Sequence, residues 1–299
     1  MKSYTELRTD FGIDTKNTAA ANLTWGDRLM NDFHRRILAK HDWPFLHRQR
    51  TLATEANTTF INLPYDVDLV ETVSVTVGST EYSPKPSASR EHWNMLHYSD
   101  YNSDIPEYWF VQNGQLGLWP EPSTAGNTIN ITCRIRVVDL AVADYTTGTI
   151  TTATNDDATI VGSGTTWTYP MVGRWLKITL DDSTDSGDGL WYEIASITNT
   201  TNLELVRKYG GTSISGGSAT YTIGNMPLLP EAYQNLPELY AAFRYWTKEK
   251  DSTRASIFKA DLDEGLNDLF TAYSVKDLSM VIDSGEHDNI INPNLLITL

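Results

Sequence analysis

Helical periodicity is confined to the two ends of this chain, whereas the segment between them follows the two-residue period of β-strands. Apolar residues keep helical spacing over 18–41, the pattern stops at Trp43-Pro44, and it returns only after Pro230. An amphipathic helix has to bury its apolar face against another element. Two helical segments this far apart in sequence are therefore expected to pack on each other, with the strand-rich middle inserted into one helical body.

The apolar stripe of the first helix is the clearest local signal. Trp25, Leu29, Phe33 and Ile37 recur every four residues. Two further helices are predicted near the C-terminus, with apolar faces formed by Leu236, Leu239, Tyr240, Phe243 and Trp246 and by Phe258, Leu262, Leu266, Leu269 and Tyr273. We expect the Phe33 face to pack on this pair of helices. Gly265 is unfavourable inside a helix, so its presence there predicts close packing at that point.

Residues 51–140 alternate apolar and polar side chains, as expected for a sheet with one solvated face. Val73, Val75 and Val77 lie on one side of a strand, and a second alternating run spans 129–137. Asn113-Gly114 between two apolar runs predicts a tight hairpin, because both residues accept a positive φ. We interpret this region as an antiparallel β insertion.

Residues 147–225 form a second β region of different composition, rich in Thr, Gly, Asn and Asp. Five or six short strands separated by turn residues predict a small sandwich or barrel. The abrupt change in composition, between two linker-like segments, indicates an autonomous and peripheral module.

These patterns predict an α+β fold in which a helical bundle from the N- and C-terminal segments carries an antiparallel β insertion and a second small β-sandwich or barrel domain. The predicted parts are the helical bundle of 1–50 and 226–280, the β insertion of 51–140, the peripheral β-module of 147–225, and an extended C-terminal tail of 283–299.

The charge of the chain excludes several classes of function. Its 299 residues carry a net charge of −15, and the densest basic runs, 34–36 and 47–50, are interpreted as solvated faces. Clamps on nucleic acid and binders of anionic membranes need basic patches. Cys133 is the only cysteine, which excludes an intrachain disulfide. Without a signal-peptide core or a long apolar run, the protein is expected to fold in a reducing cytoplasm with no membrane anchor.

No motif in the sequence predicts an enzyme, a metal site or a cofactor. Counted from Asp182, the acidic loop of 181–189 reaches a calcium-loop position at Glu193, but positions three and five lack carboxylates. A solvated turn is the preferred interpretation. His92 and His97 lie five residues apart, on different faces of a helix, with no third ligand nearby. Nucleophile-elbow, zinc-protease and phosphate-loop motifs are absent, so we expect a non-enzymatic protein.

Three tryptophans of the second β region are the remaining candidates for a binding surface. Trp167, Trp175 and Trp191 could form a platform on which sugar rings stack. Their strand spacing in a small β-domain favours a core position instead, because aromatic side chains dominate protein cores.

Several features combine into a recognisable order of elements. An N-terminal helix ends in a Trp-Pro turn, the β insertion contains Leu63-Pro64 and Leu116-x-Leu118-Trp119-Pro120, and Leu229-Pro230-Glu231 opens two C-terminal helices. This order resembles the head-to-tail adaptors of tailed phages, also called connector, neck or head-completion proteins. The segment 148–223 is similar to a β-module that recurs in phage structural proteins, although compact adaptors usually lack so large an insertion.

The resemblance implies a structural virion protein, a ring of commonly twelve subunits that joins the portal to the tail around the DNA channel. The implied partners are further copies of the chain, the portal protein and tail or neck proteins. Double-stranded DNA would pass through without sequence-specific binding, and an acidic ring would repel its phosphates and let it slide. The implied location is the neck of the virion, after assembly in the host cytoplasm. The alternative is a tail-associated protein that binds or cleaves carbohydrate through the tryptophan-rich module.

The C-terminal tail is the candidate attachment site. Residues 283–299 mix chain breakers with apolar residues and follow neither a helical nor a strand period. Apolar side chains with nowhere to bury indicate a partner, and within the resemblance that partner is the portal. The predicted portal-binding residues are Ile290, Ile291, Leu295, Leu296, Ile297 and Leu299.

Overall fold

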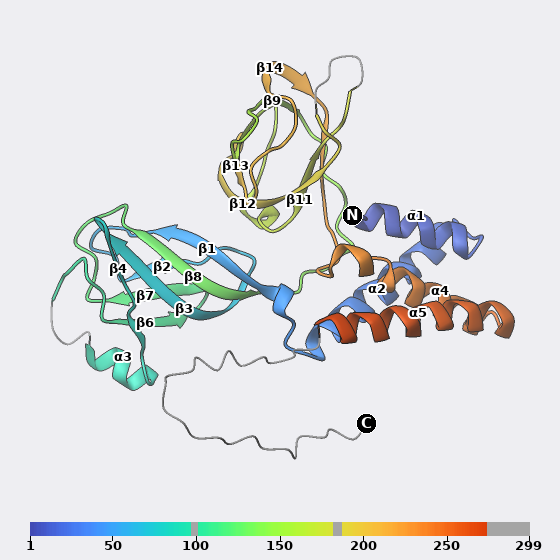
Figure 1. The fold of residues 1–299 in the computed structure, drawn as a ribbon, viewed down its shortest axis with the longest axis horizontal. Coiled ribbons are helices and arrows are strands. Elements are labelled where there is room, and N and C mark those ends of the chain that lie inside the picture. Colours follow the sequence, from blue (N-terminus) through green and yellow to red (C-terminus); the bar gives the residue numbers. More distant parts are fainter. Residues whose placement is uncertain (97–100, 182–186, 274–299) are drawn as a thin grey trace, which may run out of the picture.

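The computed structural model describes residues 1–96, 101–181 and 187–273. Three lobes are visible in Figure 1: a layer of helices at the right, a β-sandwich at the left and a curved β-sheet at the top. We call them the helical layer, the sandwich and the half-barrel. The chain begins in the helical layer, runs through the sandwich and the half-barrel, and returns to the helical layer.

The helical layer is built from both ends of the chain. Its helices are α1 (Tyr4–Asp14), α2 (Ala20–Ala39), α4 (Leu236–Lys248) and α5 (Ser252–Tyr273). Ser3 caps α1, because its side chain accepts a hydrogen bond from Glu6 N while the Glu6 carboxylate accepts one from Ser3 N. The chain turns after α2 at a short 3-10 helix, Pro44–Leu46.

The predicted contact between the first long helix and the C-terminal pair is confirmed. Phe33 of α2 is buried and stacks on Tyr240 of α4, with ring centroids 5.0 Å apart. Phe33 and Ile37 share one apolar cluster with Leu262 of α5. The close packing predicted at Gly265 is also confirmed, because a Cβ added there would lie 2.6 Å from Leu236 Cδ2.

The sandwich consists of two four-stranded sheets. The first has the order β1 (His47–Ala53), β8 (Thr128–Ile135), β3 (Val67–Val77), β4 (Thr80–Tyr82), and the second β2 (Phe60–Asn62), β7 (Gln115–Trp119), β6 (Tyr108–Gln112), β5 (Lys85–Pro86). Helix α3 (Arg90–Leu96) packs on the second sheet through Trp93, which stacks on Phe110. The two sheets share one core, which contains Val73, Trp109, Leu118 and Ile131.

The hairpin predicted at Asn113-Gly114 is confirmed. It joins β6 to β7, and its two residues have φ angles of 52° and 73°, as a two-residue hairpin turn requires. The prediction of an antiparallel β insertion over 51–140 is wrong for one edge strand, β5. Strand β5 pairs with β6 in parallel, with Lys85 opposite Tyr108. A parallel pair needs a long crossover connection, and here residues 87–107, including α3, provide it.

The half-barrel is one seven-stranded sheet. Its order is β14 (Ile214–Ala219), β9 (Thr149–Ala153), β10 (Thr159–Ser163), β13 (Asn202–Leu205), β12 (Trp191–Asn199), β11 (Trp175–Ile178), β15 (Tyr221–Gly224). Strands β14 and β15 follow each other directly in sequence yet lie at opposite margins of the sheet. A single segment, 214–224, therefore reaches both margins and curls the sheet around its own core. That core contains the fully buried Trp167 and Tyr209.

The predicted fold class, a helical bundle with β insertions, is wrong. Helices and strands take nearly equal shares of the described residues, 31% and 32%, and the strands form several sheets that include the half-barrel. The physical reason is that each β lobe buries an apolar cluster of its own. The sheets therefore do not depend on the helices for a core, and the helices form one lobe among three.

Candidate functional site at the junction of the lobes

A buried ion pair joins the sandwich to the half-barrel. Arg50 of β1 is only 5% exposed, and its guanidinium donates from Nε and Nη2 to Asp66 Oδ2, at 3.0 and 2.5 Å. The same Nη2 donates to Glu193 Oε1 of β12 at 2.6 Å. Arg48, two residues earlier on the same side of β1, places its Nη2 3.8 Å from Glu193 Oε2. One arginine of the sandwich thus binds a carboxylate from each β lobe.

The two carboxylates keep Arg50 charged in this buried position. Burial acts to lower the pKa of Arg50, but the hydrogen bonds and negative charges of Asp66 and Glu193 outweigh it and raise that pKa. A buried charge is costly unless its partners are close and well oriented. The ion pair is therefore a point where the two lobes depend on each other's side chains.

Backbone contacts strengthen the same junction. The hydroxyl of Tyr169, on the 3-10 helix Tyr169–Met171 of the half-barrel, donates to the carbonyl of Leu63 in the sandwich. Gly173 has a φ of +81°, and a Cβ added there would lie 3.1 Å from Asp66 Cβ. The close approach of the two lobes at this point therefore favours glycine.

The two segments that lead into and out of the half-barrel are held by polar residues of α2. Asn31 Oδ1 accepts a hydrogen bond from Leu140 N at 2.7 Å, and His34 Nε2 accepts one from Leu228 N at 2.9 Å. Asn225 Nδ2 ties the two segments together by donating to Asp139 O at 2.8 Å. Burial, with a smaller effect of Arg35, lowers the pKa of His34 to about 3. Its neutral ring is what allows Nε2 to act as an acceptor.

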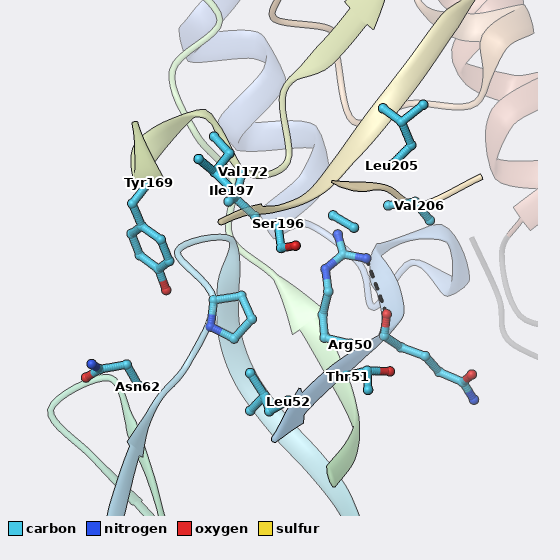
Figure 2. A pocket seen from close by; sticks show the side chains of 13 residues that line it. Arg50, Thr51, Leu52, Asn62, Tyr169, Val172, Ser196, Ile197, Leu205 and Val206 are labelled. Atoms are coloured by element: carbon cyan, nitrogen blue, oxygen red, sulfur yellow. Dashed lines mark hydrogen bonds between the residues drawn. The ribbon is translucent and has the colours of Figure 1, made fainter. Parts of the chain in front are cut away.

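A groove of about 420 Å³ lies beside the ion pair (Figure 2). Its floor and one wall come from β1, from Asn62 at the end of β2 and from Pro64 in the loop that follows. The facing wall belongs to the half-barrel, where Tyr169 and Ser196 are exposed. The groove contains few charged groups besides Arg50, so its chemistry suits a peptide segment better than an ion.

Four of the candidate residues from the sequence lie in the described part of the chain: Trp167, Trp175, Trp191 and His92. Trp167 is 1% exposed and donates from Nε1 to the Tyr221 hydroxyl at 3.0 Å inside the half-barrel core, so the interpretation as a core residue is confirmed. Trp175 and Trp191 are only half-buried, so the core interpretation holds for Trp167 alone, and Lys177 Nζ lies 4.7 Å from the ring centroid of Trp191. His92 bonds to Ser87 and packs against Tyr108. A sugar platform built around Trp167 is therefore not available.

The other candidates lie outside the described residues. They are the six portal-binding residues of the C-terminal tail, His97, and most of the calcium-like loop. Within the parts of the chain that are described, no cluster of three His, Cys, Asp or Glu side chains could hold a metal ion. In the same parts, no helix is both long and apolar enough to cross a membrane.

A second buried charge lies within the helical layer. Glu238, in the first turn of α4, is 4% exposed, and its Oε1 has no hydrogen-bond partner among the described residues. Burial of the carboxyl, followed by the nearby carboxylates of Asp14 and Asp10, raises the pKa of Glu238 to about 9, against the opposing charge of Lys2. This carboxyl is therefore protonated in the folded protein at neutral pH.

Glu238 makes stability fall as pH rises. Between pH 4.5 and 9 the folded state holds a proton that the unfolded state releases, so the free energy of unfolding should fall by up to roughly 1.4 kcal/mol per pH unit. Glu238→Gln should remove this slope and stabilise the protein at pH 8, with little change at pH 4.5. Denaturation in urea across this range measures the effect. Glu249→Gln, at an exposed residue after the same helix, should leave the slope intact, and identical profiles for both variants would contradict the assignment.

The sequence matches the SU10 adaptor protein family over residues 2–162, which is more than half of the chain. The match spans α1, α2, the sandwich and the first two strands of the half-barrel. These features define a structural adaptor of a bacteriophage, a class of virion component. The chain belongs to the SU10 adaptor protein family. Among curated proteins, none matches it.

Proposed function

We propose that this adaptor forms a ring that joins the portal to the tail around the DNA channel. The observation that carries the proposal is the family match over residues 2–162. The division into lobes supports it, because a ring subunit needs separate surfaces for its neighbours and for the structures above and below it. The role is structural and non-enzymatic, and it needs neither a metal nor a cofactor.

The negative charge of the chain fits a conduit for DNA. A net charge of −15 on each subunit, repeated around a ring, would repel the phosphates of a passing duplex. Tight binding to phosphates would slow the passage of DNA instead. The ring would thus surround double-stranded DNA without reading its sequence.

The proposed partners follow from this position. They are further copies of the chain, with twelve as the expected number, the portal protein on one side and tail or neck proteins on the other. The proposed location is the neck of the virion, with assembly in the host cytoplasm. Negative-stain imaging of the purified protein, alone and mixed with its portal, tests the proposal. Rings with a lumen wide enough for a DNA duplex are expected, and a protein that stays monomeric with portal present would contradict it.

The C-terminal tail is the proposed attachment to the portal. The apolar end of 290–299 would gain free energy by burial on a partner. Truncation after Asp283 should leave each of the three lobes folded, because the described residues alone give each lobe a buried apolar cluster. The same truncation should abolish co-sedimentation with portal particles. Undiminished binding would move the attachment surface to the lobes.

A further inference from the structure

The groove beside the ion pair lies along an open strand edge. Four consecutive residues of β1, 49–52, line it. Consecutive side chains of a strand point to opposite faces of the sheet, so a groove that touches all four follows the edge of the strand. β1 is the first strand of its sheet, with β8 on its other side. Its outer margin therefore offers backbone N–H and C=O groups that no described strand pairs.

The facing wall of the groove is formed by strand β12 of the half-barrel and the 3-10 helix Tyr169–Met171 beside it. Three consecutive residues of β12, Ala195, Ser196 and Ile197, line it. Strand β11 pairs with β12 only as far as Glu193, and beyond Ile194 the 3-10 helix Tyr169–Met171 lies against β12 in place of a paired strand. The groove thus runs between the open edge of β1 and a wall of the half-barrel, and Figure 2 labels Thr51 and Leu52 from the first and Tyr169, Ser196 and Ile197 from the second.

Among the side chains around the groove, several are apolar and partly exposed, and they alternate with polar ones such as Thr51 and Ser196. Leu52 and Ile197 are half-buried, whereas Tyr169 is 47% and Val206 43% exposed. Exposed backbone groups along a strand, flanked by pockets for apolar side chains, are the features that bind an added β-strand. The groove therefore fits an extended peptide with apolar residues and no charge.

We propose that this groove binds the chain's own C-terminal segment, Asn294–Leu299, as an added strand on β1. The six residues are Asn-Leu-Leu-Ile-Thr-Leu, with no charged side chain, glycine or proline, a composition that favours a strand.

The path from α5 to the groove is short. The end of α5 packs beside the start of β1, where the rings of Tyr273 and Phe45 lie 5.4 Å apart and those of Phe270 and Trp43 5.1 Å apart. Residues 274–293 can span up to about 65 Å when extended, whereas the seven residues of β1 cover only about 24 Å. A tether of this kind gives the segment a high local concentration at its own groove.

This inference goes beyond the proposed portal attachment and stands without it. If the tail binds both the groove and the portal, the two sites compete for the same apolar residues. The groove then covers these residues until the subunit binds the portal. A tail that is covered until attachment would protect the free subunit from aggregation through Leu295, Leu296 and Ile297.

Disulfide trapping in the full-length chain tests the proposal. Thr51→Cys on the edge of β1 is combined in turn with Leu295→Cys, Leu296→Cys and Ile297→Cys. An added strand brings facing Cα atoms to about 5 Å, within the range of a disulfide. Native Cys133 does not interfere, because it is fully buried and burial raises the pKa of its thiol to about 11. Mild oxidation should give an intramolecular disulfide, read by non-reducing electrophoresis and peptide mapping.

The expected yields alternate along the tail, because only every second side chain of a strand faces the same way as residue 51. The control is Thr80→Cys on β4, an equally exposed threonine at the opposite open margin of the same sheet. The best pair with residue 51 should exceed this control by at least about fivefold. Yields that match the control, or disulfides found only between two chains, would overturn the proposal. Neither outcome would bear on portal binding, which co-sedimentation measures separately.

Discussion

Replacing Arg50 by alanine is expected to lower the free energy of unfolding by about 3–5 kcal/mol, because removal of one partner from a buried ion pair leaves the other charges uncompensated. Asp66 and Glu193 would remain buried and close to each other, and Arg48, 3.8 Å from Glu193 Oε2, would compensate only one of the two charges in part. Urea denaturation of wild type and variant, followed by far-UV circular dichroism, measures the loss.

The matched control is Arg134→Ala. Arg134 lies on β8, next to β1, and pairs with Asp68 at 3.0 Å, but both side chains are about 40% exposed or more. An exposed pair contributes at most about 1 kcal/mol. Replacing Arg50, Asp66 and Glu193 together by Met, Leu and Leu should recover much of the loss, since no buried charge then remains. Similar small effects for Arg50→Ala and Arg134→Ala would contradict the role assigned to the buried pair.

Phe33→Ala is expected to cost a similar amount, about 3–5 kcal/mol, for a different reason. Phe33 is 7% exposed and stacks on Tyr240, and truncation of a buried aromatic ring loses its burial and leaves a cavity. The same urea titration measures the change. Arg36→Ala, on the exposed side of the same helix, should stay within about 0.5 kcal/mol. A loss below about 1 kcal/mol for Phe33→Ala would mean that this core contributes little to the stability of the single subunit.

Phe33 and Arg50 are both buried, but only the burial of Phe33 can be predicted from the sequence. The burial of Phe33 follows from the four-residue spacing of its neighbours, which is a local pattern. Arg50 belongs to a basic run whose pattern predicts a solvated face, but it is buried, and its partner Glu193 lies 143 residues away. No local period encodes a contact over that distance. His34, assigned to another solvated basic run, is fully buried for the same reason, since its partner is the backbone of Leu228.

The fold class is harder to predict from the sequence than the single helices, strands and turns. The Asn113-Gly114 hairpin and the close packing at Gly265 follow from the conformational preferences of single residues. To predict the fold class, one has to know which apolar residues share a core. The alternation of apolar and polar residues along a strand shows only which face is buried, because it does not identify the element that covers that face. That the sheets of the sandwich bury those faces against each other, and that segment 214–224 curls the half-barrel, depends on strand pairing across long stretches of chain.

The assembly of the helical layer from both chain ends has a consequence during synthesis on the ribosome. Helix α2 ends at Ala39 and α4 begins at Leu236, so about 200 residues must be translated before the partner of α2 exists. At ordinary rates of translation this takes roughly 10–40 s. Both β lobes can complete their cores in that time, while the apolar stripe of α2 stays open to chaperones or to other nascent chains. The helices encoded first are therefore expected to be the last part of the subunit to reach their final packing.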